Sequence, residues 1–220
     1  MSTPGNSTTS WWLFPPATRE VQFDEKWSFV GKKEKHCDRD DPADDGCGDH
    51  WDHVAIDAEH RLALSVVPGR QSAEHTLALV RDVARRTGGA PLSLFTSDEN
   101  PAYAVALLEV YGVPKQRRRK GRRGRKPLPV KVPPPELVYA TVHKTRENNR
   151  VVQVETRRTY GTKAALAEAL VRSAVSARVT TVYVERHNGT DRNRNARKVR
   201  KTYCFSKDWA VHEAVTYFTM

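Results

Sequence analysis

The first half of the chain alternates short apolar runs with turn residues, a pattern typical of strands joined by tight connections. The stretch VQFDEKWSFVGKK, residues 21–33, mixes β-branched and aromatic residues up to Gly31 and predicts a strand. Residues 34–49 are acidic and rich in turn formers, so we expect a loop there. Two apolar runs within residues 51–69 flank the residues DAEH and predict a β-hairpin.

Two stretches that follow have the spacing of helices. In SAEHTLALVRDVARRTGG the apolar residues recur every three or four positions, Ser72 can cap the start and Gly88 can end the helix. The run PLSLFTSD predicts a buried strand that ends at Asp98, and PAYAVALLEVYG predicts a helix with Pro101 in its first turn. The order strand, hairpin, helix, strand, helix favours an α/β core with a mixed sheet.

The second half of the chain predicts another hairpin and three helices. Residues 136–161 contain two β-rich runs that turn near Asn148 and Asn149. The stretch GTKAALAEALVRSAVSA has helical spacing, with Thr162 as a possible cap. The basic stretch TTVYVERHNGTDRNRNARKVRKTY predicts the next helix, and CFSKDWAVHEAVTYFTM predicts the last.

The positive charge of the chain is concentrated in one segment. The formal net charge is +11 and the sequence pI about 9.8, so we expect a polyanionic partner, with nucleic acid as the first choice. Nine Lys and Arg residues lie between Lys115 and Lys126 with no acid among them. Because prolines and glycines accompany them, we expect a flexible basic linker or arm and not a helix.

The sequence lacks the marks of membrane and secreted proteins. No apolar run approaches the roughly 20 residues of a membrane span. The N-terminus shows no basic start followed by an apolar stretch, as a signal peptide would. Three cysteines suit a reducing compartment better than a disulfide framework. We expect a cytoplasmic protein associated with the nucleoid.

The cysteines and histidines around the acidic loop raise the question of a metal site. The gap between the two cysteines is longer than in a zinc knuckle, and no second pair exists. We favour a solvated loop, and the alternative is a metal cluster formed by Cys37, Cys47, His36 and His50. Cys204, further along, is expected to be a small core residue.

Three carboxylates stand where a fold can place them rigidly, at a strand, at a strand end and on a late helix: Asp24, Asp98 and Glu185. Oxygen ligands of this kind suit Mg²⁺, and paired ions can assist phosphodiester displacement. Other interpretations stay open. Asp24 could be a strand-edge residue and Asp98 a helix cap. Glu185 could form an ion pair with Arg186 or Arg192. Glu25, next to Asp24 along the strand, is expected to point to the opposite face.

Three stretches together resemble the transposases of the insertion-sequence-one family. They are VQFDEKWSFVGKK, LFTSDENPAY, and TTVYVERHNGTDRNRNARK with CFSKDWAVHEAVTYF. The family motifs run Asp-Glu-x-Trp-x-x-Val-Gly, Thr-x-Asp-x-x-x-x-Tyr, and Glu-Arg-x-Asn before a basic helix and Phe-Ser-Lys. The resemblance covers residues 21–220. It implies an RNase H-like mixed sheet with flanking helices, and a basic arm and hairpin inserted before the last catalytic helix.

The resemblance also implies an activity and the residues that perform it. Matched by motif, the catalytic and metal-binding residues are Asp24, Asp98 and Glu185, acting with Mg²⁺ or Mn²⁺. The implied reaction is cleavage at transposon ends followed by strand transfer into target DNA. Asp57, in the predicted hairpin turn, is a rival first carboxylate. The alternative function is a catalytically inactive DNA-binding fragment or a regulator of transposition.

Composition and the resemblance together give boundaries and partners. We expect a flexible arm (1–20), the first part of the catalytic domain (21–112), a basic linker (113–135), and a hairpin with the C-terminal helices (136–220). The expected partners are double-stranded DNA, further copies of the chain on that DNA, and a DNA-reading segment from an upstream reading frame. The expected DNA-binding residues are Arg117, Arg118, Arg119, Lys120, Arg122, Arg123, Arg186, Asn188, Arg192, Arg194, Arg197 and Lys198.

Overall fold

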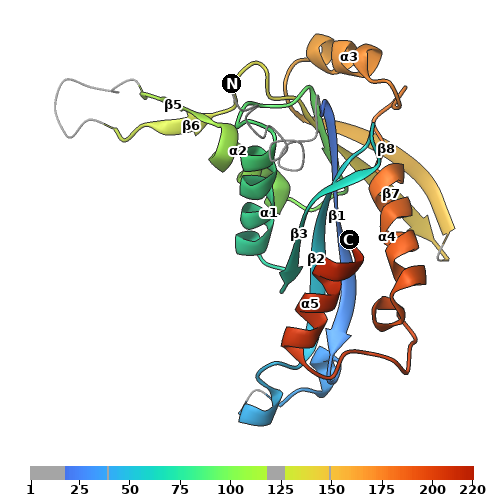
Figure 1. Ribbon diagram of the computed structural model, residues 1–220. Helices are drawn as coiled ribbons and strands as arrows, with labels where there is room; N and C mark the ends of the chain where they lie inside the picture. Colours follow the sequence, from blue (N-terminus) through green and yellow to red (C-terminus); the bar gives the residue numbers. More distant parts are fainter. Residues whose placement is uncertain (1–17, 39, 118–126, 149) are drawn as a thin grey trace, which may run out of the picture.

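The computed structural model describes residues 18–38, 40–117, 127–148 and 150–220. These residues form an α/β structure around a six-stranded sheet of order β3-β2-β1-β4-β7-β8 (Figure 1). The strands of this sheet are β1 (Glu20–Val30), β2 (Gly48–Asp57), β3 (Leu62–Gly69), β4 (Leu94–Ser97), β7 (Tyr139–Glu147) and β8 (Arg150–Tyr160).

The sheet is mixed, as the sequence predicts. The three strands β1, β4 and β7 run parallel to one another, whereas β2, β3 and β8 pair antiparallel with their neighbours. The first hairpin, β2–β3, is confirmed. The second, β7–β8, is also confirmed, and Asn148 in its turn has a left-handed backbone with φ of 49°.

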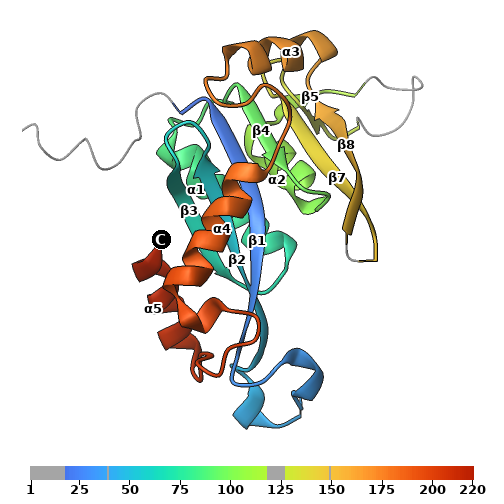
Figure 2. The same ribbon diagram turned by 90° about the vertical axis from the view of Figure 1, so that its right-hand side faces the viewer.

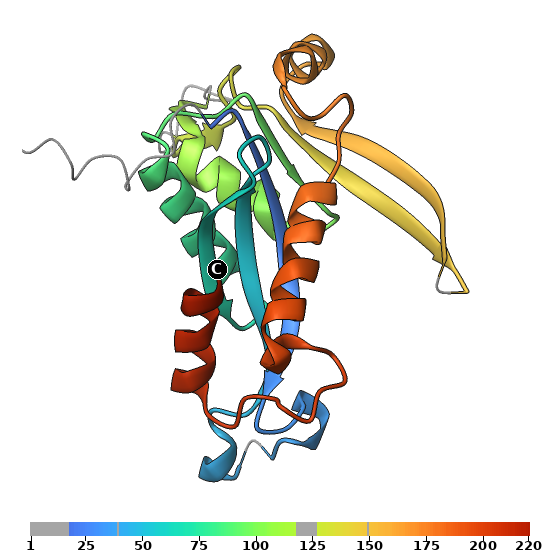
Figure 3. The ribbon, with the colours of Figure 1, turned by 45° about the vertical axis from the view of Figure 1, so that its right-hand side comes forward.

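The second hairpin belongs to the main sheet, because β7 pairs directly with β4 and so forms an inner strand. The two predicted halves of the catalytic domain, residues 21–112 and 136–220, therefore build one sheet. Only the distal end of the hairpin extends away from the body (Figure 3).

Helices cover both faces of the sheet (Figures 1 and 2). Two pack side by side on one face, and the other three lie against the opposite face. The helices are α1 (Ala73–Arg86), α2 (Ala102–Tyr111), α3 (Lys163–Arg172), α4 (Val182–Arg194) and α5 (Trp209–Thr219). The predicted caps are confirmed, since Ser72 accepts from His75 N and Thr162 from Ala165 N.

The two faces of β1 differ in chemistry, and this difference positions the site. Val21 and Phe23 are fully buried against α1 and α2, where Phe23 stacks on Phe95 and Tyr103. The alternate residues of β1 are polar and face α4. A strand whose side chains alternate in this way separates an apolar core from a polar interface.

Several expected segments differ in detail. The acidic loop contains two 3₁₀ turns, Glu34–His36 and Pro42–Asp44, before β2 begins. Part of the expected linker pairs as a two-stranded ribbon, β5 (Val113–Lys115) with β6 (Val130–Val132), because their extended backbones satisfy each other's hydrogen bonds. Residues 118–126 and 1–17 of the two expected arms lie outside the described residues.

The end of the basic helix and one cysteine also differ from expectation. Helix α4 ends at Arg194, and the rest of the basic run forms a 3₁₀ turn, Ala196–Lys198, followed by a loop. The prediction that Cys204 is a core residue is wrong, since Cys204 is exposed in that loop. None of the helices in the described ranges combines the length and apolarity needed to cross a membrane.

Candidate active site

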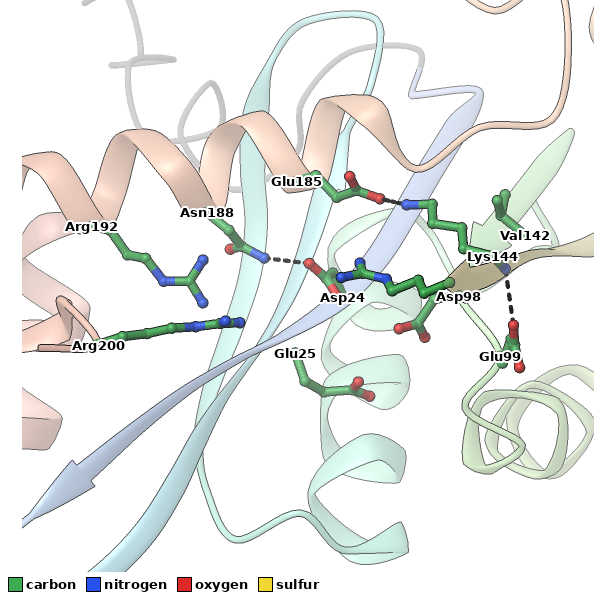
Figure 4. Close-up of a pocket in the computed structure, with 11 residues that line it drawn as sticks. Asp24, Glu25, Asp98, Glu99, Val142, Lys144, Glu185, Asn188, Arg192 and Arg200 are labelled. Carbon is green, nitrogen blue, oxygen red and sulfur yellow. Dashed lines mark hydrogen bonds and ion pairs between the residues drawn. The ribbon is translucent and has the colours of Figure 1, made fainter. Parts of the chain in front are cut away.

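A pocket of about 530 Å³ opens between β1, the end of β4, β7 and helix α4 (Figure 4). All three carboxylates predicted from the sequence line it. Its walls combine acidic and basic side chains and hold a single apolar one. The lining residues are Asp24, Glu25, Asp98, Glu99, Val142, Lys144, Arg146, Glu185, Asn188, Arg192 and Arg200.

The register of the parallel strands explains why Asp24 and Asp98 meet. Strand β1 pairs with β4 as far as Gln22, which lies opposite Thr96. Asp24 follows Gln22 by two residues, and Asp98 follows Thr96 by two residues. Strand β4 ends at Ser97, so within the described residues this edge of β1 has no strand partner from Asp24 until Val30, which forms a bridge with Ser206. The strand end therefore leaves an opening into which both carboxylates reach.

A further carboxylate, Glu25, belongs to the same cluster. Carboxylate oxygens of Asp24, Glu25 and Asp98 all lie within 4.8 Å of one another. Sequence reasoning placed Glu25 on the opposite face, and its side chain does accept from Asn100 Nδ2 at 2.6 Å on the α2 side. Because β4 stops short here, side chains from both faces of β1 reach one opening. The sequence indicated this only through two adjacent acids, Asp24 and Glu25, in the middle of a predicted strand.

The cluster concentrates negative charge in a partly buried place. Burial, reinforced by the charge of Asp98, raises the pKa of Asp24 to about 6. Burial and Asp98 likewise raise the pKa of Glu25 to about 7. Burial also raises the pKa of Asp98. The charge of Lys144 lowers the pKa of Asp98 without offsetting this burial. The clustered oxygen donors of the three carboxylates fit a hard divalent ion such as Mg²⁺.

These raised pKa values predict that, without metal, the acidic cluster contributes less to stability as pH rises. Between the ordinary carboxyl values near 4 and the raised values of about 6 and 7, Asp24 and Glu25 bind more protons in the folded state than in the unfolded state. Burial lowers the pKa of His50 and His212 to about 4, and these groups contribute in the opposite direction. Urea denaturation in EDTA from pH 4 to pH 7 should therefore show that an Asp24→Asn, Glu25→Gln double variant gains stability relative to wild type as pH rises. An unchanged slope relative to wild type would contradict the assignment.

Glu185 lies in the same pocket but outside the tight cluster. It stands in the first turn of α4 with its side chain 43% exposed. Thr181 Oγ1 donates to its carboxylate at 2.6 Å, and Lys144 of β7 forms an ion pair with it (Figure 4). The structure thus brings Asp24 and Asp98 together as predicted and holds Glu185 beside them through Lys144.

Contacts from β1 set the position of the start of α4. Gln22 Oε1 accepts from the backbone N–H groups of Tyr183 and Val184, at 3.0 and 3.2 Å, and so satisfies two free donors of the helix. One turn further, Asn188 Nδ2 donates to Asp24 Oδ2 at 2.8 Å. The prediction that Asn188 contacts DNA is therefore corrected: it is buried and orients the Asp24 carboxylate.

The remainder of α4 is held by buried ion pairs. Lys26 pairs with Asp191 of α4 and, at 3.3 Å, with Asp52 of β2. Lys198 Nζ lies 2.9 Å from the other oxygen of Asp52 and is itself fully buried. The prediction that Lys198 binds DNA is wrong, because its ammonium group is engaged inside the protein.

The basic side of the pocket comes from β7, α4 and the loop after α4. Arg192, one of the expected DNA-binding residues, lines the pocket. Its Nε has no hydrogen-bond partner among the described residues. Burial and the nearby charge of Arg200 lower the pKa of Arg192. Two guanidinium groups that repel each other form a favourable place for an anion.

The other predicted DNA-binding residues fall elsewhere. Arg186 and Arg194 are exposed on α4 without lining the pocket, and Arg197 is half-buried in the turn after it. Arg117 is exposed next to β5. The remaining arm residues lie outside the described residues: Arg118, Arg119, Lys120, Arg122 and Arg123.

The rival carboxylate Asp57 has a structural role. It is fully buried at the end of β2 and accepts from Thr18 Oγ1 at 2.6 Å and from the backbone of Glu59 and His60. It does not line the pocket, so the structure does not place it as a first ligand. Within the described ranges, Asp24, Glu25 and Asp98 are the only group of three such residues close enough for a metal ion, and the cysteines form none.

Comparison with known proteins gives no further constraint, because no protein-family model and no curated protein matches the chain. The function is therefore inferred from the chemistry of the pocket and from the motifs in the sequence.

Proposed function

We propose that this chain is a DNA transposase of the Asp-Asp-Glu type that cleaves transposon ends and joins them to target DNA. The observation that carries the proposal is the convergence of Asp24, Glu25 and Asp98 in one pocket whose opposite wall is basic. A DNA phosphate and a divalent cation need these two kinds of wall side by side.

The proposed fold is RNase H-like. In support, an antiparallel meander β3-β2-β1 continues through the parallel strands β4 and β7, and helices cover both faces. Asp24 lies on an inner strand, Asp98 follows the neighbouring parallel strand, and Glu185 comes from the helix packed across them. This is the arrangement that the motif resemblance implies.

Most of the charged pocket residues have a role in the proposed reaction. Asp24, Glu25 and Asp98 would hold Mg²⁺ or Mn²⁺, with Glu185 as a further ligand once it separates from Lys144. A bound cation of this kind activates the attacking oxygen and stabilises the leaving one. Asn188 keeps the Asp24 carboxylate turned into the pocket.

The basic wall would bind the substrate. Arg192 and Arg200 would receive the phosphate oxygens, and Lys144 would contact the backbone when it leaves Glu185. Such contacts orient DNA without reading its sequence. Further copies of the chain and a DNA-reading segment from an upstream reading frame remain proposed partners.

One observation favours a second candidate function, a DNA-binding regulator without catalysis. Glu185 is paired with Lys144 and lies outside the acidic cluster, so the predicted trio is not assembled in this structure. A regulator would keep the basic surface and would not need the carboxylates.

Nicking of supercoiled plasmid by the purified chain, with Mg²⁺ or Mn²⁺ and with EDTA, distinguishes the two functions. A transposase is expected to nick DNA only with the metal, whereas a regulator binds DNA and leaves it intact. Binding without nicking under both metals would overturn the proposed activity.

The basic arm is expected to supply sequence-independent affinity. Its nine Lys and Arg residues between Lys115 and Lys126 can each displace a condensed counterion from DNA. Replacing all nine by Gln should make the slope of log affinity against log salt shallower by up to about 8, equally for unrelated duplexes. Gel shifts across a salt series measure this slope, and an unchanged slope would show that the arm does not touch DNA.

A further inference from the structure

A second hollow in the surface lies on the other side of the segment that follows α4. This groove of about 570 Å³ runs between the end of α4, the loop of residues 199–208 and helix α5. It shares no lining residue with the acidic pocket. The loop nevertheless connects the two, since Arg200 lines the pocket and Tyr203, three residues later, lines the groove.

The charge of the groove is of one sign. Arg194, Arg197 and Lys207 line it, and its lining contains no carboxylate. Within the described part of the chain, no side-chain ion pair with an acid engages any of these three cations. Unpaired cations around a hollow favour an anionic ligand, and a phosphate backbone supplies anions at regular intervals.

The groove also presents an aromatic ring to solvent. Tyr203 is 98% exposed, although a tyrosine ring is largely apolar. Its neighbour Phe205 is anchored, because it packs on Phe29 of β1 at a ring-centroid distance of 4.9 Å and lies under Lys207 Nζ at 4.9 Å. The loop is thus fastened at Phe205 and leaves Tyr203 projecting, with no partner ring among the residues that the structure describes.

The groove combines cations that have no acidic partner with an exposed tyrosine ring. We therefore propose that it binds a single strand of DNA, with an unpaired base stacked on Tyr203. Stacking platforms beside a basic track are the general means by which proteins hold unpaired nucleic acid. In an intact duplex the base faces are covered by their neighbours, so Tyr203 can add affinity only for unpaired bases. The groove adjoins the pocket through one loop, so it would receive a strand separated near the cleaved phosphate.

The test compares a labelled oligothymidylate of about 15 nucleotides with a duplex of the same length by fluorescence anisotropy, in EDTA at about 0.15 M salt. Tyr203→Ala should weaken binding of the single strand about tenfold and leave the duplex unchanged. Tyr203→Phe keeps the ring and should retain wild-type affinity. Tyr217→Ala, which removes an exposed tyrosine of α5 outside the groove, is the matched control and should change neither affinity.

Two results would overturn the inference. One is equal affinity of wild type and Tyr203→Ala for oligothymidylate, and the other is an equal loss on both ligands, which would make Tyr203 part of a general phosphate-binding surface. A photo-crosslink from a 5-iodouracil oligonucleotide should map to the peptide that contains Tyr203. Because no measurement uses metal or cleavage, failure here leaves the proposed transposase activity to be judged by nicking alone.

Discussion

Asp24→Asn is expected to abolish metal-dependent nicking, with a loss of at least about 10³-fold, and to leave DNA binding intact. The amide keeps the size of the carboxylate and can still meet Asn188, so the pocket keeps its shape. What it removes is the negative charge that a divalent cation requires. Asp98→Asn should behave alike, since its carboxylate belongs to the same cluster.

The matched control for this prediction is Asp57→Asn. Asp57 is an aspartate at the end of the neighbouring strand β2, opposite Val21, and it is buried and hydrogen-bonded outside the pocket. It should lower stability without a specific effect on nicking by the folded protein. The site assignment would be wrong if Asp57→Asn stopped cleavage while Asp24→Asn cut DNA at the wild-type rate.

Glu185→Gln tests the predicted trio separately from the cluster. The same loss of nicking is expected if Glu185 joins the carboxylates in the active form. Wild-type nicking by Glu185→Gln would assign the metal to Asp24, Glu25 and Asp98 without it. Gel shifts on every variant establish that the basic wall still binds DNA.

The second large effect is expected from Asp52, the acid between two buried lysines. Asp52→Asn should lower the free energy of unfolding by about 3–5 kcal/mol, because it leaves the ammonium groups of Lys26 and Lys198 without their shared partner. Burial by itself raises the pKa of Asp52, and the charges of Lys198 and Lys26 more than reverse this, so the pKa stays below its usual value. The carboxylate is therefore ionised at neutral pH and compensates both cations.

Urea denaturation measures this loss, with Glu168→Gln as the control. Glu168 forms an exposed i,i+4 ion pair with Arg172 on α3, and its removal should cost less than about 1 kcal/mol. If Asp52→Asn were no more costly than Glu168→Gln, the buried pairs of Asp52 with Lys26 and Lys198 would contribute nothing measurable to stability.

Much of the fold follows from local pattern. The alternation along β1, the capping residues Ser72 and Thr162 and the apolar spacing of α1 each depend on neighbours in the chain, and the structure confirms them. Two site residues were also recognisable in the sequence. Asp24 is an acid on a predicted strand, and Asp98 is an acid at the end of a predicted buried strand.

Other features depend on where β4 stops relative to β1. Side chains alternate between the two faces of a strand, and this correctly predicts that Glu25 lies on the α2 side. Its carboxylate still joins the cluster, because β4 ends early and leaves this part of the β1 edge open. Likewise, a hairpin that looked like an insertion supplies an inner strand, because β7 finds its partner in β4, more than forty residues earlier in the chain.

The chain pattern alone determined most of the helices and strands, the basic character and three of the acids that line the pocket. Which charges are buried and which are exposed was decided only by the tertiary structure. Lys198 sits in a run of arginines and lysines, yet its ammonium group meets Asp52, 146 residues away in the chain. Asn188 meets Asp24 across 164 residues. The physical reason is that periodicity depends on neighbours, whereas burying a charge or an amide depends on a partner that only the folded sheet brings within reach.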